Sequence, residues 1–277
     1  MTARPIRRNA QTPDRNGKIF YTSTTSLSHI SKLEGYHSLE TVFRDFLQYS
    51  AVTISNICDG VHYAERQKAR EVLLRKYQGN ITLYDCFRTF IKAIQKNQEA
   101  GMLRDILGAI FESIGLSNGH TGQFFTPENI SQFMAKLTFD KELQELQEKP
   151  YSTVTDPCIG SGRMLLAYAK TLLDAGYNYC EKMVGMAVDI DITCVYMSYV
   201  QLSMYGIPAV VIHGDSITVE EWSRWYTPAY VWGGWVFKQP MGITTETSED
   251  DFKLQRFILS LLEEDKEKKL EEFLATV

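Results

Sequence analysis

Apolar residues recur every three to four positions over a long stretch that begins at Leu39, which is the spacing of one face of an α-helix. Turn residues, among them Gly79 and Gly101, interrupt this pattern. Before Leu39 there is no sustained period, so we expect residues 1–38 to form a mobile arm. The pattern predicts helices over 39–57, 63–77, 82–98 and 102–114, and their apolar faces should form the core of a helical domain.

A further helix is expected to begin after Thr126-Pro127, because threonine is a frequent N-cap and proline fits the first helical position. The preceding residues, 116–126, are loop-like, and the helix should run to about residue 137. The charged residues 140–150 are expected to form a linker or a short helix.

After Tyr151 the hydrophobic pattern changes to short segments of the strand type that alternate with helical patterns. This β-α-β-α-β order, with strands of the buried type, is typical of a parallel sheet with right-handed crossovers. We therefore predict an α/β fold with a Rossmann-like core, preceded by a helical N-terminal domain, and the prediction allows for an incomplete sheet. The predicted strands are 152–156, 183–188 and 209–213, with helices over 163–175 and 192–205.

The remaining residues are less regular. Residues 220–226 lack the apolar pattern of a strand, and a last strand is considered at 231–238. One apolar face predicts an amphipathic helix over 252–274. The predicted organisation is an arm (1–38), a helical domain (39–120), a Rossmann-like core (121–245) and an acidic C-terminal helix (246–277).

Composition and charge reduce the number of protein classes to which the chain could belong. The 277 residues are 44% hydrophobic and 23% charged, as in soluble globular proteins, and no apolar run approaches the ~18 residues of a membrane span. Residues 1–18 lack the apolar segment of a secretory signal, so we expect a cytoplasmic protein. The net charge of −5 excludes a protein that coats nucleic acid by charge alone. Residues 1–20 hold five basic residues against one acidic residue, a net charge of +4, which favours a solvated tail, with phosphate contacts as the alternative.

The sequence motifs give no support for a metal site or for a hydrolase active site. The five cysteines form no CxxC pair, and the five histidines form no HxxxH or HExxH pattern, so reduced thiols and no metal are expected. No GxSxG segment occurs either.

The first candidate site is a glycine-bearing turn after the first predicted strand. Asp156 ends that strand, and Gly160, Ser161 and Gly162 lead into a helix whose first N–H groups can meet a ligand. The spacing is not GxGxxG, so a cofactor with a free ammonium fits better than a dinucleotide. Asp189, at the end of the second strand, can accept from the two hydroxyls of a ribose, whereas Asp191 should point elsewhere.

Two further segments are candidates, each with a structural alternative. The segment of Gln123, Phe124, Phe125, Thr126 and Pro127 could stack its rings on a base or cover a cofactor, or could dock the helical domain. Asp215, after the third strand, could accept from an adenine amino group or could serve the Gly-Asp-Ser turn.

In this order, the segments GQFFTPENI, DPCIGSGRML, AVDID and HGDS resemble the adenine-N6 DNA methyltransferases, and above all the modification subunit of type I restriction-modification systems. The resemblance covers roughly residues 100–217. It implies S-adenosylmethionine as the cofactor, with Gln123–Pro127 and Gly160–Gly162 around it. It also implies that Asp156 meets the methionyl end, Asp189 the ribose and Asp215 the adenine. The implied substrate is DNA, with the target adenine flipped out of the duplex and a separate specificity subunit as partner.

The chain departs from this family at its catalytic signature, Asn/Asp-Pro-Pro-Phe/Tyr, which does not occur. The nearest candidate in position is Thr227-Pro228-Ala229-Tyr230, from which Thr227, Pro228 and Tyr230 are the predicted, degenerate catalytic residues. We therefore expect little or no adenine methylation by this chain alone. Two alternatives stay open: a non-catalytic binding or regulatory module of a mobile element, and a methyltransferase for RNA or protein glutamine.

Overall fold

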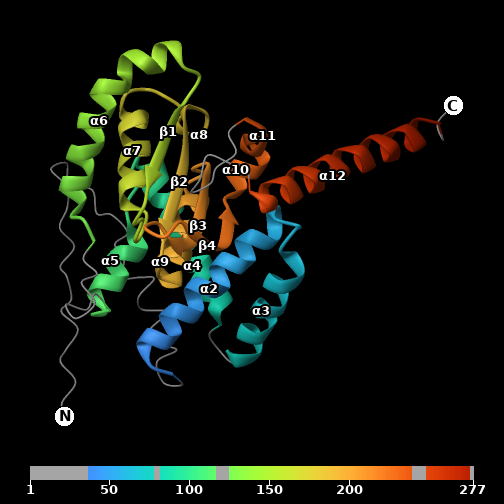
Figure 1. Cartoon of the computed structure of the whole chain (residues 1–277). Helices are drawn as coiled ribbons and strands as arrows, with labels where there is room; N and C mark the ends of the chain where they lie inside the picture. The colour runs from blue at the N-terminus through green and yellow to red at the C-terminus, as the bar shows by residue number, and fades with distance from the viewer. Residues whose placement is uncertain (1–36, 78–81, 117–124, 239–247, 275–277) are drawn as a thin grey trace.

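The computed structural model describes residues 37–77, 82–116, 125–238 and 248–274 (Figure 1). The predicted arm therefore lies almost wholly outside the described residues. The first part of the described chain is helical, as predicted. Its helices are α2 (Leu39–Cys58), α3 (Tyr63–Lys76), α4 (Leu83–Glu99) and α5 (Ile106–Ser113).

Local side-chain chemistry determines where these helices begin. Thr82 and Asp85 form a reciprocal capping box at α4, in which each side chain accepts from the other residue's main-chain N–H. Helix α5 begins four residues later than predicted because the Asp105 side chain accepts from Gly108 N at 2.7 Å and caps it.

The sheet has four strands in the order β1-β2-β3-β4. The first three pair in parallel, and β4 runs antiparallel to β3. Because three strands are parallel, their carboxyl ends lie together at one end of the sheet. The predicted α/β class, with a helical region before the sheet, is confirmed. The strands are β1 (Ser152–Asp156), β2 (Met183–Asp189), β3 (Ala209–Asp215) and β4 (Glu220–Tyr226).

Helices cover both faces of the sheet (Figure 1). On one face, a continuous apolar cluster joins Phe46 and Phe111 of the helical region to Tyr199 and Val211. A second cluster lies on the other face, around Val184 and Tyr226. The predicted domain boundary at residue 120 falls outside the described residues. The remaining helices are α6 (Glu128–Glu148), α7 (Arg163–Asp174), α8 (Tyr179–Lys182), α9 (Ile192–Met204), α10 (Pro228–Trp232), α11 (Trp235–Lys238) and α12 (Glu249–Leu274).

Three sequence predictions are corrected. The strand considered at 231–238 is wrong: Thr227 caps α10, Pro228 occupies its first turn, and α11 follows after two glycines. Residues 220–226 do form a strand, β4, although they are not apolar. Residues 140–148 belong to α6, which continues without a linker. In the part of the chain that the structure describes, no helix is long and apolar enough to cross a membrane.

Candidate functional site

The turn between β1 and α7 has the backbone shape that glycine favours. Gly160 and Gly162 adopt φ values of 55° and 93°, in the left-handed region. A Cβ at Gly160 would lie 3.0 Å from the ring of Phe125, and one at Gly162 would lie 3.4 Å from Ser198. The two glycines therefore allow Phe125 and α9 to pack closely against the turn at the start of α7.

Two carboxylates flank this turn at the carboxyl ends of adjacent parallel strands. Asp189 accepts from Gly160 N through Oδ2 and from Asp191 N through Oδ1, each at 2.9 Å. Asp156 accepts from Cys158 N at 3.1 Å. The structure thus brings Asp156, Asp189 and the glycine turn together, as the strand order predicts. Asp191 instead caps α9 through Thr193 N.

Burial makes this pair of carboxylates receptive to a cation. It raises the pKa of Asp156, and the nearby charge of Asp189 raises it further, against the lowering effect of the Cys158 N–H. Burial also raises the pKa of Asp189, against the lowering hydrogen bonds from Asp191 and Gly160. A positively charged ligand group beside them would relieve the repulsion.

We expect Asp156→Asn to stabilise the ligand-free protein at pH 7, by roughly 0.5–1 kcal/mol, the size common when a strained functional site is relaxed. A raised pKa means that the folded state binds more protons, so the charged Asp156 lowers the free energy of unfolding at neutral pH. Asparagine keeps the acceptor for Cys158 N but removes the charge.

Urea unfolding at pH 7 and at pH 4 measures this effect. The advantage of the variant should shrink at pH 4, because the raised pKa of Asp156 lets the folded wild-type protein take up the proton before the unfolded chain does. A less stable Asp156→Asn protein at pH 7 would contradict the electrostatic account.

The segment before α6 packs against the glycine turn. The Phe125 ring lies against Gly160 and, at 5.3 Å between ring centroids, against Phe111. Arg163 Nη1 donates to the Thr126 carbonyl at 2.7 Å. The Pro127 carbonyl accepts from the first turn of α6. Gln123 and Phe124 lie outside the described residues.

A buried polar network that the sequence analysis missed holds this arrangement in place. The Asp105 carboxylate, at the start of α5, accepts from Ser161 Oγ at 2.5 Å, Arg163 Nε at 2.7 Å and Gln201 Nε2 at 2.8 Å. Gln201 also donates to the Ser161 carbonyl and accepts from Ile106 N. Asp105 therefore ties the glycine turn to α5, α7 and α9. Its N-cap position before Ile106 is a signal that could have identified it.

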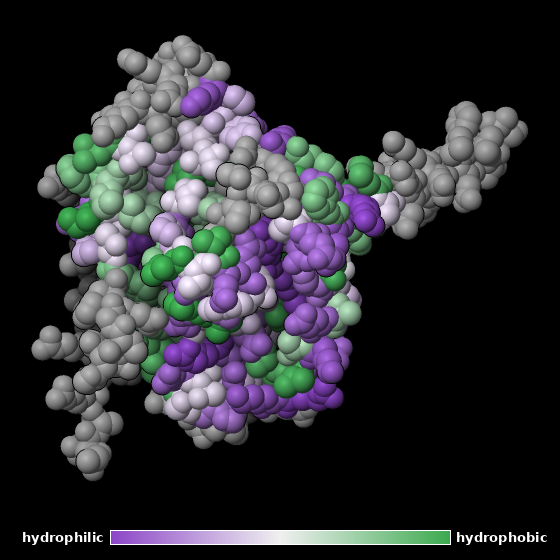
Figure 2. All heavy atoms as spheres, viewed as in Figure 1, coloured by the Kyte–Doolittle hydropathy of each residue, from purple (hydrophilic) through white to green (hydrophobic). Residues whose placement is uncertain are grey.

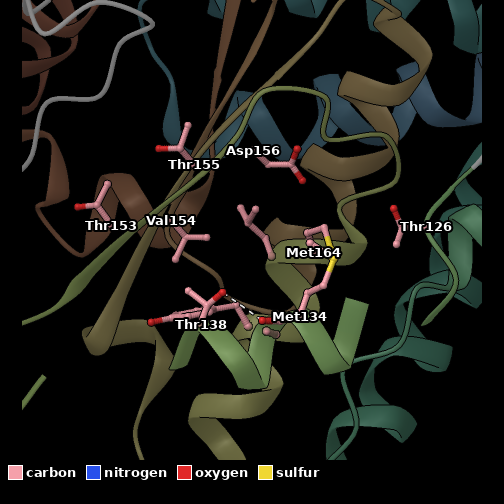
Figure 3. Close-up of a pocket in the computed structure, with 11 residues that line it drawn as sticks. Thr126, Met134, Thr138, Thr153, Val154, Thr155, Asp156 and Met164 are labelled. Carbon is pink, nitrogen blue, oxygen red and sulfur yellow. Dashed lines mark hydrogen bonds between the residues drawn. The ribbon is translucent and has the colours of Figure 1, made fainter. Parts of the chain in front are cut away.

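A cavity of about 450 Å³ opens beside this site (Figure 3). Figure 3 shows Asp156 at one end and Met134 and Thr138 at the other. Its lining comes from the segment before α6 and from α6, β1 and α7: Thr126, Met134, Ala135, Thr138, Thr153, Val154, Thr155, Asp156, Met164, Leu165 and Tyr168.

The predicted catalytic residues are not at this site. Thr227 is fully buried; its hydroxyl donates to the Ile207 carbonyl and accepts from Ala209 N, each at 2.9 Å. These contacts place Thr227 and Pro228 at the amino end of β3. Because β3 has seven residues, this end lies about 20 Å from the carboxyl end of the strand, where the candidate site is. Tyr230 is also fully buried and stacks on Tyr226.

The physical reason is the direction of β4. β4, the strand that precedes these residues, is antiparallel to β3 and returns the chain to the amino ends of the parallel strands. Asp215 does lie at the carboxyl end of β3, where its side chain accepts from Ile217 N and Thr218 N of the turn. Among the described residues, no three His, Cys, Asp or Glu side chains converge to hold a metal ion.

The parallel strands, the glycine turn and the acidic strand ends define a Rossmann-like α/β protein with a cofactor-type site. The model of the N-6 DNA methylase family matches residues 102–268, well over half of the chain. The chain belongs to the N-6 DNA methylase family, which confirms the resemblance found in its sequence. No curated protein matches it.

Two solved structures resemble the chain at 14% sequence identity and a TM-score of 0.33 each. One is a protein from Listeria monocytogenes described as a class I S-adenosylmethionine-dependent methyltransferase; the match covers 79% of each chain. The other is the type I restriction-modification system methyltransferase subunit from Streptococcus thermophilus; the match covers 73% of this chain and 60% of that one. The chain thus spans less than two thirds of the second structure's length.

Proposed function

We propose that this chain binds S-adenosylmethionine at the carboxyl ends of β1 and β2 and serves as the cofactor-binding part of an adenine-N6 DNA methyltransferase. The single observation that supports the proposal is the arrangement of Asp156 and Asp189 beside the glycine turn at the carboxyl ends of two adjacent parallel strands. The family match points to the same cofactor.

The chemistry of the donor set fits this cofactor. S-adenosylmethionine contains an ammonium, a sulfonium and a ribose diol, and it supplies an electrophilic methyl group when bound. Asp156 is positioned to accept from the ammonium, and Asp189 from the ribose hydroxyls. Each Asp189 oxygen already accepts one main-chain N–H, which fixes the carboxylate in the turn and leaves further lone pairs for the diol. Phe125 packs against Gly160 of the turn.

Calorimetric titration with S-adenosylmethionine tests the proposal. We expect saturable one-site binding, and S-adenosylhomocysteine, which lacks the sulfonium charge, should bind more weakly because the carboxylates favour a cation. Absence of saturable binding at millimolar cofactor would contradict the proposed function.

Methyl transfer by the chain alone is expected to be absent or at least 10²–10³-fold slower than ordinary turnover, by analogy with the loss of one transition-state hydrogen bond. Tyr230 and Thr227 lie near the amino end of β3 and are buried. They therefore cannot contact a base at the cofactor site, which lies at the carboxyl ends of the parallel strands. The measurement is transfer of a labelled methyl group to DNA, with RNA and a glutamine-containing protein in parallel.

This assay also distinguishes the proposed methyltransferase from a second candidate function, a binding module that performs no chemistry. That candidate is favoured by the burial of the nearest match to the catalytic signature. Cofactor binding without methyl transfer, even with a specificity subunit present, would support the module. Ordinary turnover by the chain alone would show that other residues form the catalytic loop.

A further inference from the structure

We propose that a cavity between the helical region and the β3–β4 side of the sheet binds a small organic cation that carries a guanidinium group. The cavity has a volume of about 510 Å³, the size of many small-molecule sites. Its walls come from α2, α3, α9, β3, β4 and the start of α12. It borders the candidate cofactor site at His213, which pairs with Asp189 in the sheet, but neither aspartate of that site lines it. The inference therefore concerns a second ligand and goes beyond cofactor binding.

One wall of the cavity already holds a guanidinium, that of Arg66. Its central carbon lies 4.0 Å from the centre of the Trp225 ring, and its nitrogens donate to the Asp59 carboxylate and to the Arg224 carbonyl. A planar cation that stacks on an indole and donates to a carboxylate is a recurrent form of guanidinium recognition. Because the Asp59 carboxylate is fully buried beside it, the charge of Arg66 is neutralised within the protein.

Trp222 repeats part of this arrangement on the wall formed by β4. This residue is 50% exposed, and its ring centroid lies 4.8 Å from that of His213, with the two rings at a steep angle. Within the described ranges of the chain, no side-chain cation stacks on Trp222. Its exposed surface can therefore take the face of a planar cation that belongs to a ligand.

Two carboxylates supply the charge that favours a cation. Glu65 is exposed in the first turn of α3, and Asp250 of α12 has 29% of its side chain exposed although it pairs with Lys253 at 3.3 Å. Figure 2 shows that hydrophilic residues predominate over α3 on the face in view. Since Asp59 neutralises Arg66, the lining repels anions and attracts cations.

Tyr196 of α9 connects these carboxylates to the aromatic wall. Its ring meets that of Trp225 edge-on, at 5.1 Å between centroids. Burial raises the pKa of the Tyr196 hydroxyl, the charge of Arg66 lowers it, and the charge of Glu65 raises it again. The negative charge of Glu65 therefore reaches the Tyr196 ring, and a cation placed between them would gain from both.

The rest of the lining selects the shape of the ligand. Val52, Ala69 and Ile192 contribute apolar atoms, which suit a short aliphatic chain. A guanidinium fits the polar part better than an ammonium does, because it is planar, weakly hydrated and able to stack on a ring while it donates in its own plane. The class of ligand that we infer is therefore an alkylguanidine.

Calorimetric titration of the full chain with butylguanidine, in the absence of cofactor, tests the proposal. We expect saturable one-site binding, and butylurea, which has a similar shape and no charge, should bind at least about tenfold more weakly. Trp222→Leu and Glu65→Gln should each weaken butylguanidine about threefold to fivefold, the size of a cation–π contact or of a partly exposed ion pair. The double variant should weaken it at least about tenfold.

Two matched variants serve as controls. Trp232→Leu removes a tryptophan that is 67% exposed on α10, and Glu71→Gln removes a carboxylate further along α3. Neither residue lines the cavity. Both variants should therefore leave the Kd of butylguanidine unchanged. All the replaced side chains are exposed, so every variant should fold like the wild type.

Several results would overturn the proposal. Absence of saturable binding, or equal affinity for butylguanidine and butylurea, would exclude a site selective for cations. Unchanged binding by the double variant would place the site elsewhere. Displacement of butylguanidine by S-adenosylmethionine would show that the cavity belongs to the cofactor site. Binding of a capped tripeptide with a central arginine, but not of butylguanidine, would show that the cavity takes a protein side chain. The titration uses no cofactor, so a failure of S-adenosylmethionine binding leaves its outcome unaffected.

Discussion

Replacing Asp189 with alanine is expected to weaken S-adenosylmethionine binding by about 100- to 1,000-fold, or ~2.7–4 kcal/mol. Two losses contribute to this estimate. The variant removes the proposed charge-assisted acceptor for the ribose hydroxyls, and it also removes the acceptor that holds Gly160 N at 2.9 Å. The glycine turn would therefore lose both a ligand contact and its own anchor. Calorimetric titration of wild type and variant measures the change.

Asp191→Ala is the matched control, because Asp191 is an aspartate two residues away with a different structural role. Its side chain accepts from Thr193 N at 2.8 Å and caps α9. Its removal should cost about 1 kcal/mol of stability, the usual value of an N-cap, while the cofactor Kd stays within threefold. If Asp191→Ala weakened the cofactor as much as Asp189→Ala does, the ribose ligand would be wrongly assigned.

Two of the three strands that the sequence predicted correctly, β2 and β3, have apolar side chains on both faces over most of their length. β2 and β3 are almost wholly buried, and a run of apolar residues is what a strand covered on both faces requires. β4 could not be found this way, because one of its buried side chains is Arg224. That guanidinium is paired with Glu221 and with Asp251 of α12, so the strand buries a charge that only the folded chain neutralises.

The residues of the candidate site also differ in how far the sequence could predict their positions. Asp156, Asp189 and the glycine turn could be predicted to meet because consecutive parallel strands end at one edge. The position of Thr227 at the amino end of β3 could not be predicted, because the sequence pattern showed neither β4 nor its antiparallel direction. The sequence analysis missed the network around Asp105 because three of its side-chain partners, Ser161, Arg163 and Gln201, lie more than fifty residues away along the chain.

Replacing Asp105 with alanine is expected to lower the free energy of unfolding by about 3–5 kcal/mol, the cost of removing one partner from a buried ion pair. The side chain of Asp105 is 3% exposed, and that of Arg163 is 11% exposed. Without the carboxylate, the guanidinium of Arg163 and the amide of Gln201 would each lose an acceptor where water has little access. Helix α5 would lose its N-cap as well.

Glu112→Ala supplies the contrast for this prediction, because Arg163 also approaches Glu112, at 3.6 Å. That carboxylate is 41% exposed, so its removal should cost less than about 1 kcal/mol. Urea unfolding of wild type and the two variants measures both values. The large expected difference between two carboxylates on the same arginine follows from burial, since water can solvate the site that Glu112 leaves but not the one that Asp105 leaves. Equal effects would mean that Asp105 does not anchor the glycine turn to the helical region, and that the apolar cluster alone holds the two together.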